Sequence, residues 1–310
     1  MDRSYAQAVR LLLVVAPDVF ANDIFAIKGG TAINLFVRDM PRLSVDIDVV
    51  YRSWKTPREQ ALREIAEELE RVATRLASLG LRSRRIAGKD SGDTKLLIEN
   101  DESLVKVEVN GVFRGTVLPI DNQSLCSRTA EMFSAELELP LLASAELYGS
   151  KLVAAMDRQH PRDLFDVWQL LEHDGISDAM IECFVTYLSG HNRPIHEVLF
   201  SNDKNIAEEY RNNFVGMTTV PVALDVLLDA RAQLRSELTR RLTLAQRQFL
   251  MGLAKAQPDW TLLQCPHASE LPALRWKLAN LLTFKQRRPA DFEQQAIELE
   301  NRFSRAGGNQ

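Results

Sequence analysis

The sequence predicts an α+β protein, in which an N-terminal mixed-sheet domain precedes a mostly helical C-terminal domain. Short segments with period-2 hydrophobic alternation recur up to about residue 112, which is typical of strands. From about residue 143 to the end, the apolar residues instead recur with helical spacing. We therefore expect two domains, residues 1–142 and residues 143–310, each of an ordinary domain size.

Composition places the chain among globular proteins of the cytoplasm. Its 310 residues are 45% hydrophobic and 26% charged. The longest early apolar run, residues 11–17, is far shorter than the roughly 20 residues that span a bilayer, so we expect no membrane association. The three cysteines are widely separated and fit neither a disulfide framework nor a zinc site, which favours a reducing, cytoplasmic environment.

The first elements form a helix, a strand, a glycine pair and a second helix. Residues 1–20 have helical periodicity, and residues 24–28 read as a short strand that stops at Gly29 and Gly30. Thr31 is a favourable N-cap, so we expect the second helix to begin there. Such a tight turn presents backbone N–H groups at a helix N-terminus.

The next elements are two further strand regions around a long helix. Residues 42–51 alternate as a strand, and residues 56–79 form an amphipathic helix with an expected Thr56/Glu59 capping box. A meander follows, with strands expected at residues 82–86, 94–99 and 104–109. Residues 119–140 read as connecting structure.

Three carboxylates on these strands suggest a metal site. Asp46 and Asp48 are two residues apart in a strand, so both point to the same face, where unpaired burial would be costly. Glu108, which shares a strand face with Lys106, is a third candidate. Together these carboxylates suit phosphoryl transfer assisted by two metal ions, for which Mg²⁺ is the default because it prefers carboxylate and phosphate oxygens.

Other residues could bind the phosphates of a nucleoside triphosphate. The backbone N–H groups of the turn at Gly29, Gly30 and Thr31 suit phosphate oxygens. Lys151, in the segment "SKLVAAMDRQHPRDLFDVWQLL", can supply a point charge.

Each feature also has a purely structural interpretation. The glycines are compatible with an ordinary turn, and the aspartates with a solvated edge strand. Lys106 and Glu108 are compatible with a solvated strand face, and Lys151 with a helix surface. Arg162 and Asp163 are compatible with an ion pair at a helix start. The combination, in this order, favours the functional interpretation.

The combined motifs resemble those of a known family. The stretches "KGGTAINLFVRDMPRLSVDIDVVY", "VKVEVN" and "KLVAAMDRQHPRDLFDVWQLL" closely resemble the AbiEii/AbiGii-type nucleotidyltransferase toxins. This family belongs to the DNA polymerase-β-like nucleotidyltransferase superfamily, and the resemblance covers roughly residues 24–171. It implies a toxin of a bacterial toxin–antitoxin or abortive-infection system that uses an NTP and Mg²⁺ to modify RNA, including the 3′ end of tRNA, and so blocks translation.

The resemblance also implies roles for individual residues. Asp46, Asp48 and Glu108 match the metal-binding carboxylates, and Gly29, Gly30 and Thr31 match the glycine-rich motif beside the phosphates. The remaining matches to the catalytic or NTP-binding residues are Ser44, Lys151, Arg158, Arg162, Asp163 and Asp166. The superfamily's usual Gly-Ser is Gly-Gly-Thr here, and the interval from Gly30 to Asp46 is longer than in many relatives.

The charge distribution suggests where RNA would bind. Residues 230–288 contain eleven Lys or Arg and three Asp or Glu, a net charge of +8, so the rest of the chain carries −12. We expect two clusters of this segment to hold an RNA backbone: Arg240, Arg241 and Arg247 in one helix, and Lys285, Arg287 and Arg288 at the end of another. These charges are equally compatible with ordinary solvated helix faces.

Three functions remain in competition at this point. The leading one is an NTP- and Mg²⁺-dependent nucleotidyltransferase toxin that acts on RNA and has a cognate antitoxin protein. Nucleotidylylation of a protein or small-molecule hydroxyl uses the same chemistry, although a small acceptor would not need the basic segment. An inert NTP-binding partner module is a third possibility, against which the presence of all three carboxylates argues.

Overall fold

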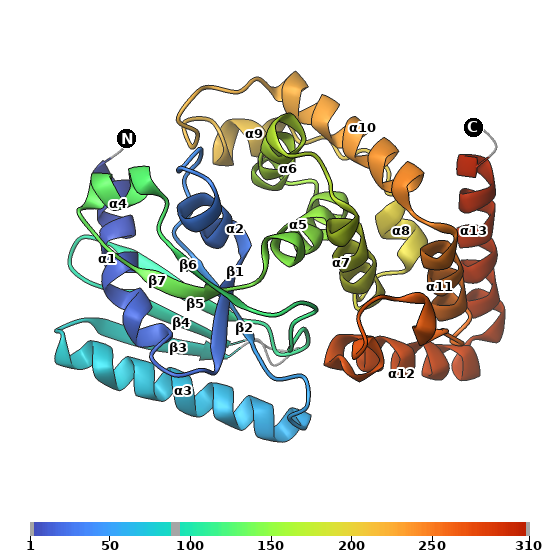
Figure 1. Cartoon of the computed structure of the whole chain (residues 1–310), viewed down its shortest axis with the longest axis horizontal. Helices are drawn as coiled ribbons and strands as arrows, with labels where there is room; N and C mark the ends of the chain where they lie inside the picture. The colour runs from blue at the N-terminus through green and yellow to red at the C-terminus, as the bar shows by residue number, and fades with distance from the viewer. Residues whose placement is uncertain (1–2, 88–93, 308–310) are drawn as a thin grey trace. The chain divides into compact units, whose positions relative to one another are not determined.

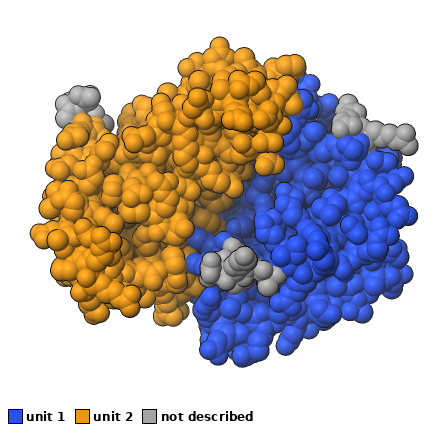
Figure 2. Space-filling view, turned by 180° about the vertical axis from the view of Figure 1, so that it is seen from behind, with its two compact units in different colours: residues 1–147, 216–220 blue, residues 148–215, 221–310 orange. Residues whose placement is uncertain are grey.

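The chain divides into two compact units. The computed structural model describes residues 3–87 and 94–307. Unit 1 comprises residues 1–147 and 216–220, and unit 2 comprises residues 148–215 and 221–310 (Figure 2). The division falls at Leu147, inside a helix, rather than between residues 142 and 143, and the short segment 216–220 is assigned to unit 1.

Unit 1 is built on a mixed sheet with helices (Figure 1). Its strands are β1 (Phe25–Lys28), β2 (Ile47–Tyr51), β3 (Arg82–Ala87), β4 (Thr94–Glu99), β5 (Leu104–Val109), β6 (Asp121–Ser124) and β7 (Glu138–Leu141). Its helices are α1 (Arg3–Val19), α2 (Gly29–Ala32), the π-helix η1 (Ile33–Val37), α3 (Arg58–Ser78), α4 (Ser127–Phe133) and the start of α5 (Ser144–Arg158).

The described strands form one seven-stranded sheet. Their order is β3-β4-β5-β2-β1-β7-β6. The β2–β5 and β1–β7 pairs are parallel, and the other neighbouring pairs are antiparallel. The predicted α+β class with a mixed sheet is therefore confirmed, and the three meander strands lie within one residue of their expected bounds.

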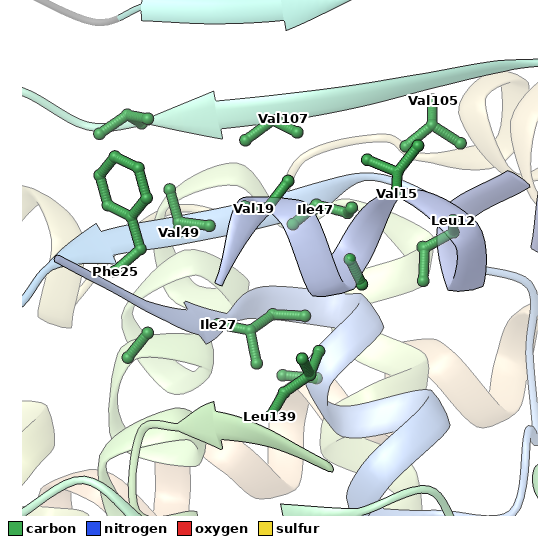
Figure 3. Packing of buried hydrophobic residues seen from close by; sticks show 14 of the residues in the cluster. Leu12, Val15, Val19, Phe25, Ile27, Ile47, Val49, Val105, Val107 and Leu139 are labelled. Atoms are coloured by element: carbon green, nitrogen blue, oxygen red, sulfur yellow. The ribbon is translucent and has the colours of Figure 1, made fainter. Parts of the chain in front are cut away.

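One face of this sheet packs against α1 and α3. Alternate side chains of the central strands, such as Ile47 and Val107, are fully buried against apolar residues of α1 (Figure 3). Helix α3 adds the stripe Ile65, Leu69, Val72 and Leu76, which the helical spacing of the sequence predicts. Because strand side chains alternate, residues Asp48 and Glu108 point to the opposite face.

Unit 2 is helical in every element that the structure describes. After α5 its elements are α6 (Pro161–His173), α7 (Asp178–Ser189), α8 (Ile195–Leu199), α9 (Ala207–Asn213), α10 (Leu224–Arg241), α11 (Leu244–Ala254), η2 (Trp260–Leu262), η3 (Ala268–Glu270), α12 (Pro272–Arg287) and α13 (Pro289–Gly307). Helix α10 packs on α6, and α13 packs on α8, α11 and α12. The expected helical C-terminal region is confirmed.

Three local expectations were wrong. Helix α2 begins at Gly29, so Thr31 lies inside it and is not the N-cap. Helix α3 begins at Arg58 without a side-chain cap, because the Thr56 hydroxyl bonds Ser53 and Tyr51 instead. Residues 119–140 contain β6, α4 and β7 rather than only connecting structure.

Candidate active site

The two aspartates and Glu108 share one sheet face in unit 1. Asp48 lies in β2, and Asp46 directly precedes this strand. Strands β2 and β5 are parallel neighbours, and Asp48 pairs in register with Glu108. The prediction of neighbouring strands is confirmed for Asp48 and Glu108. It is wrong for Asp46, because β2 begins only at Ile47 and the expected strand does not extend back to Asp46.

Gly29 brings the glycine pair into direct contact with Asp48. Gly29 has a φ of +79°, a conformation that favours glycine. A Cβ atom placed on Gly29 would lie 2.3 Å from Asp48 Oδ2, well inside van der Waals contact. The absent side chain thus leaves room for a carboxylate oxygen beside the turn between β1 and α2.

Gly30 has a different neighbour. A Cβ atom on Gly30 would lie 2.6 Å from Arg42 Nη2 and 2.9 Å from Ser44 Oγ. The second glycine is therefore needed because the segment that leads into Asp46 passes directly against α2. The structure brings Ser44 to this turn, as the sequence motif implies.

Thr31 links α2 to the segment that carries Ser44 and Asp46 through its hydroxyl group. Its side chain is fully buried, its Oγ1 donates to the Asp46 carbonyl oxygen at 2.5 Å, and it shares a hydrogen bond with Ser44 Oγ at 3.0 Å. The Ser44 backbone N–H donates to Tyr5 Oη at 3.2 Å, so α1 also holds this segment. Burial raises the pKa of the Tyr5 hydroxyl. Tyr5 was missed at the sequence level because its contact with Ser44 is long-range.

Two lysines contact the third carboxylate. Lys106 Nζ lies 2.9 Å from Glu108 Oε1 and 3.4 Å from Asp46 Oδ1. Lys95 Nζ, on the neighbouring strand β4, lies 3.0 Å from the same Glu108 oxygen. Lys95 and Glu108 are register partners, a pairing that needs the strand alignment and so was missed.

These contacts set the charge states of Glu108 and Lys106. Burial raises the pKa of Glu108, but hydrogen bonds from Lys106 and Lys95 outweigh burial, so its pKa lies below its ordinary value. Burial lowers the pKa of Lys106, but Glu108 and Asp46 outweigh it, so its pKa lies above its ordinary value. Glu108 is therefore a carboxylate and Lys106 an ammonium group at neutral pH.

The sheet face that carries Asp48 and Glu108 has equal numbers of carboxylates and lysines among the residues named here. Across β1, β2, β5 and β4, successive register partners are Lys28, Asp48, Glu108 and Lys95. Adding Asp46 and Lys106 gives three carboxylates and three ammonium groups on this face. Because the lysines already compensate the negative charge, this face requires fewer bound cations than three isolated carboxylates would.

The residues of this face fit one divalent cation better than two. Asp46 and Asp48 are half-buried, and carboxylate oxygens are preferred by Mg²⁺. Asp48 Oδ2 occupies the space that the missing Gly29 Cβ leaves. Glu108 Oε1 is instead engaged by two ammonium groups. Within residues 3–87 and 94–307, no three His, Cys, Asp or Glu side chains form a group that could hold a metal ion.

A second cluster lies in unit 2, between α5 and α6. Lys151 is 7% exposed, and its Nζ lies 3.0 Å from both Asp163 Oδ1 and Asp166 Oδ2. Arg158 Nη2 lies 2.8 Å from Asp163 Oδ2. The structure thus brings together four of the predicted site residues in this unit, with the Lys151 charge opposed by two buried carboxylates.

The start of α6 places Asp163 in this cluster. Pro161 occupies the first turn, and the His160 ring accepts a hydrogen bond from the Arg162 backbone N–H at 3.1 Å. Burial lowers the pKa of His160, which favours the neutral ring that accepts this bond. Asp163 forms ion pairs with Lys151 and Arg158.

Most basic side chains of residues 230–288 already have partners within unit 2. Arg240 and Arg241 pair with Glu237, and Arg247 donates to the Thr239 carbonyl oxygen. Lys277 is buried, which lowers its pKa to about 8, and it donates to backbone carbonyl oxygens. The basic residues with exposed side chains in this segment are Arg240, Lys255, Arg275, Lys285, Arg287 and Arg288. The trio Arg240, Arg241 and Arg247 is thus a poorer RNA-binding surface than its net charge suggests, whereas Lys285, Arg287 and Arg288 are all exposed at the end of α12.

No helix in the described part of the chain is both long and apolar enough to cross a membrane.

Comparison with known proteins identifies a family and a related fold. A sequence model of the family described as nucleotidyl transferase AbiEii toxin, type IV toxin–antitoxin system, matches residues 10–280. Among curated proteins, none matches the chain. Among solved structures, the chain is similar to MenT4, a nucleotidyltransferase toxin from Mycobacterium tuberculosis, with a TM-score of 0.60. The two are 18% identical over 90% of this chain and 94% of that chain, which shows a shared fold.

Proposed function

The chain belongs to the AbiEii nucleotidyltransferase toxin family of type IV toxin–antitoxin systems, and on this premise we propose that it transfers a nucleoside monophosphate from an NTP to the 3′ end of tRNA. Family membership makes it an NTP-using transferase with an antitoxin partner. Modification of the tRNA 3′ end would prevent aminoacylation, block translation and inhibit growth. Since tRNA and NTPs are substrates of the cytoplasm, the toxin would act there.

The observation that supports this proposal most is the contact between Gly29 and Asp48. It places a carboxylate oxygen directly beside the glycine turn of α2. Asp46 and Asp48 would hold Mg²⁺, which neutralises phosphate oxygens and lowers the pKa of the attacking hydroxyl group when it is bound. The glycine pair lets the Asp48 carboxylate and the Ser44 side chain lie directly against the start of α2, where backbone N–H groups would meet the triphosphate.

Other residues of unit 1 position this face. Thr31 and Ser44 fix the segment that carries Asp46 through the hydrogen bonds of the Thr31 hydroxyl. Ser44 Oγ, next to Gly30, donates to Thr31 Oγ1, because the Thr31 hydroxyl proton goes to the Asp46 carbonyl oxygen. Ser44 would therefore bind a phosphate oxygen only by giving up its bond to Thr31. The protein would therefore orient substrate oxygens with side chains that these hydrogen bonds hold in place.

In unit 2, Lys151 would supply a positive charge for the triphosphate. Asp163 and Asp166 hold its ammonium group between them, so they act as positioning residues. Arg158, whose side chain is 61% exposed, and the half-buried Arg162 are candidates for further phosphate contacts. The three cations exceed the two carboxylates by one positive charge, which would attract a phosphate group.

The proposal is tested by asking where the nucleotide goes. The purified chain is incubated with each NTP labelled at the α-phosphate and with total tRNA, with Mg²⁺ or with a chelator. We expect label in tRNA only with Mg²⁺. Periodate treatment of the tRNA, which destroys the 3′-terminal diol, should abolish the labelling.

Other outcomes would contradict specific parts of the proposal. Label in protein and none in RNA would indicate nucleotidylylation of a protein hydroxyl. Label in neither would contradict the RNA acceptor and favour a small-molecule acceptor or an NTP-binding role. Equal labelling of periodate-treated tRNA would contradict transfer to the 3′ end.

A further inference from the structure

Lys106 occupies a position where a cation would be expected. Its Nζ bridges two carboxylates, those of Glu108 in β5 and of Asp46, which directly precedes β2. The contact with Glu108, at 2.9 Å, is shorter than the contact with Asp46, at 3.4 Å. Lys106 is therefore anchored on Glu108 and makes the looser contact with Asp46.

We propose that Lys106 is a built-in cation of this face, that Glu108 is its anchor rather than a metal ligand, and that the face binds a single divalent cation at Asp46 and Asp48. The inference rests on the proposed function, from which it takes the premise that a divalent cation binds at this face. It departs from the two-metal, three-carboxylate arrangement that the sequence suggests.

The geometry around Glu108 supports this assignment. Its Oε1 accepts hydrogen bonds from both Lys106 and Lys95, at 2.9 and 3.0 Å. A metal ion that bound this oxygen would lie close to two ammonium groups, and like charges at such distances repel strongly. Glu108 is thus better suited to hold lysines than to share a metal ion with Asp48.

Asp46 can exchange partners at lower cost. Its contact with Lys106 is the longer one, and its side chain is 40% exposed, so water reaches it. When a divalent cation binds Asp46, Lys106 keeps its contact with Glu108 and gives up only the weaker one. Lys106 would then remain near the bound cation as a second positive charge for substrate phosphates.

Charge-neutral removal of the Lys106–Glu108 pair separates this inference from a direct metal role of Glu108. Mn²⁺ alone is titrated into the full-length chain by calorimetry and by the electron paramagnetic resonance of free Mn²⁺. The variants are Lys106→Met, the double variant Lys106→Met/Glu108→Gln, and Asp48→Asn. Lys95→Met is the matched control, because Lys95 contacts Glu108 and has no contact with Asp46 among the ion pairs of the described residues.

The expected results differ clearly between the variants. The wild-type chain should bind one Mn²⁺, and Asp48→Asn should lose at least tenfold in affinity. Lys106→Met should bind one Mn²⁺ about fivefold more tightly or better, because Asp46 loses its competing cation. Lys95→Met should change the affinity by a smaller factor than Lys106→Met does. The double variant should bind one Mn²⁺ with an affinity within threefold of wild type.

A loss of more than threefold in the double variant, two Mn²⁺ sites in the wild type, or no Mn²⁺ binding would overturn the inference. If Lys106→Met is insoluble, Lys106→Gln alone and with Glu108→Gln replaces it under the same criteria. Circular dichroism establishes that each variant is folded. Since these titrations use neither NTP nor RNA, failure of the RNA-labelling assay with intact Mn²⁺ binding would contradict the acceptor and leave this inference standing.

Discussion

Gly29 lies directly against Asp48, so that a Cβ atom at position 29 would be 2.3 Å from the Asp48 Oδ2 atom. The glycine also has a φ of +79°, which disfavours any other residue. Gly80, at the end of α3, has a similar φ of +77°, but no atom lies within 4 Å of its Cβ position. The two glycines therefore share backbone strain and differ in the contact with a carboxylate.

Substitution of these glycines separates strain from contact. We expect Gly80→Ala to lower the free energy of unfolding by about 1 kcal/mol, through backbone strain alone. Gly29→Ala should cost about 1–3 kcal/mol more, because Asp48 must move, and nucleotide transfer should fall below detection. Urea unfolding and the tRNA-labelling assay measure these effects. Transfer by Gly29→Ala at the level of Gly80→Ala would show that the contact has no role in activity.

The Thr31 hydroxyl is expected to position Asp46. Thr31→Val keeps the shape but removes the donor to the Asp46 carbonyl oxygen, which should cost about 1–2 kcal/mol of stability. Because Asp46 would lose its fixed position, kcat for transfer should fall about tenfold or more. Thr31→Ser keeps the hydroxyl and should retain most of the activity. Equal kcat values for the Val and Ser variants would contradict a positioning role.

The buried ion pairs of Lys151 should stabilise unit 2 strongly. Lys151→Met leaves the carboxylates of Asp163 and Asp166 buried without this ammonium group, and we expect a loss of about 3 kcal/mol in urea unfolding. Arg158→Met removes a side chain that is 61% exposed and should cost less than about 1 kcal/mol. If both variants unfolded alike, the cluster would be solvated rather than buried.

Glu68 should make unfolding depend on pH in the acid range. Its carboxylate is fully buried, and burial raises its pKa, but hydrogen bonds from Arg71, Arg75 and Asn22 outweigh burial, so the folded pKa lies below its usual value. This stabilisation is therefore complete above the unfolded pKa of about 4.3 and is lost as pH falls through the folded pKa. The difference in unfolding free energy between wild type and Glu68→Gln should be constant near neutral pH and shrink in acid. A difference that stayed constant down to acid unfolding would contradict the prediction.

Some features could be predicted from the sequence because they depend on local periodicity. The period-2 pattern placed Asp48 and Glu108 on one face, and strand pairing confirmed it. Strand β6, "DNQS", was missed because it is short, polar and exposed throughout, so it carries no hydrophobic alternation. Partners far apart in the sequence, such as Tyr5 with Ser44, depend on the tertiary fold and leave no local pattern.

Charge counts were the least informative signal. The net charge of residues 230–288 predicted a basic surface, yet two of its arginines pair with Glu237 and Lys277 is buried. A sum over a segment does not show which side chains have partners from the same unit. The partners of Lys106 are likewise visible only in the folded chain, so its role could not be assigned until the distances to Glu108 and Asp46 were known.

The most direct measurement compares tRNA labelling by NTP that carries its label at the α-phosphate or at the γ-phosphate, using the wild-type chain and Asp48→Asn. Transfer of a nucleoside monophosphate predicts label in tRNA from the α-position and none from the γ-position. Asp48→Asn, which is nearly isosteric, should be folded and should incorporate neither label. Label from the γ-phosphate, or wild-type incorporation by Asp48→Asn in Mg²⁺, would contradict a nucleotidyl transfer that depends on this face of the sheet.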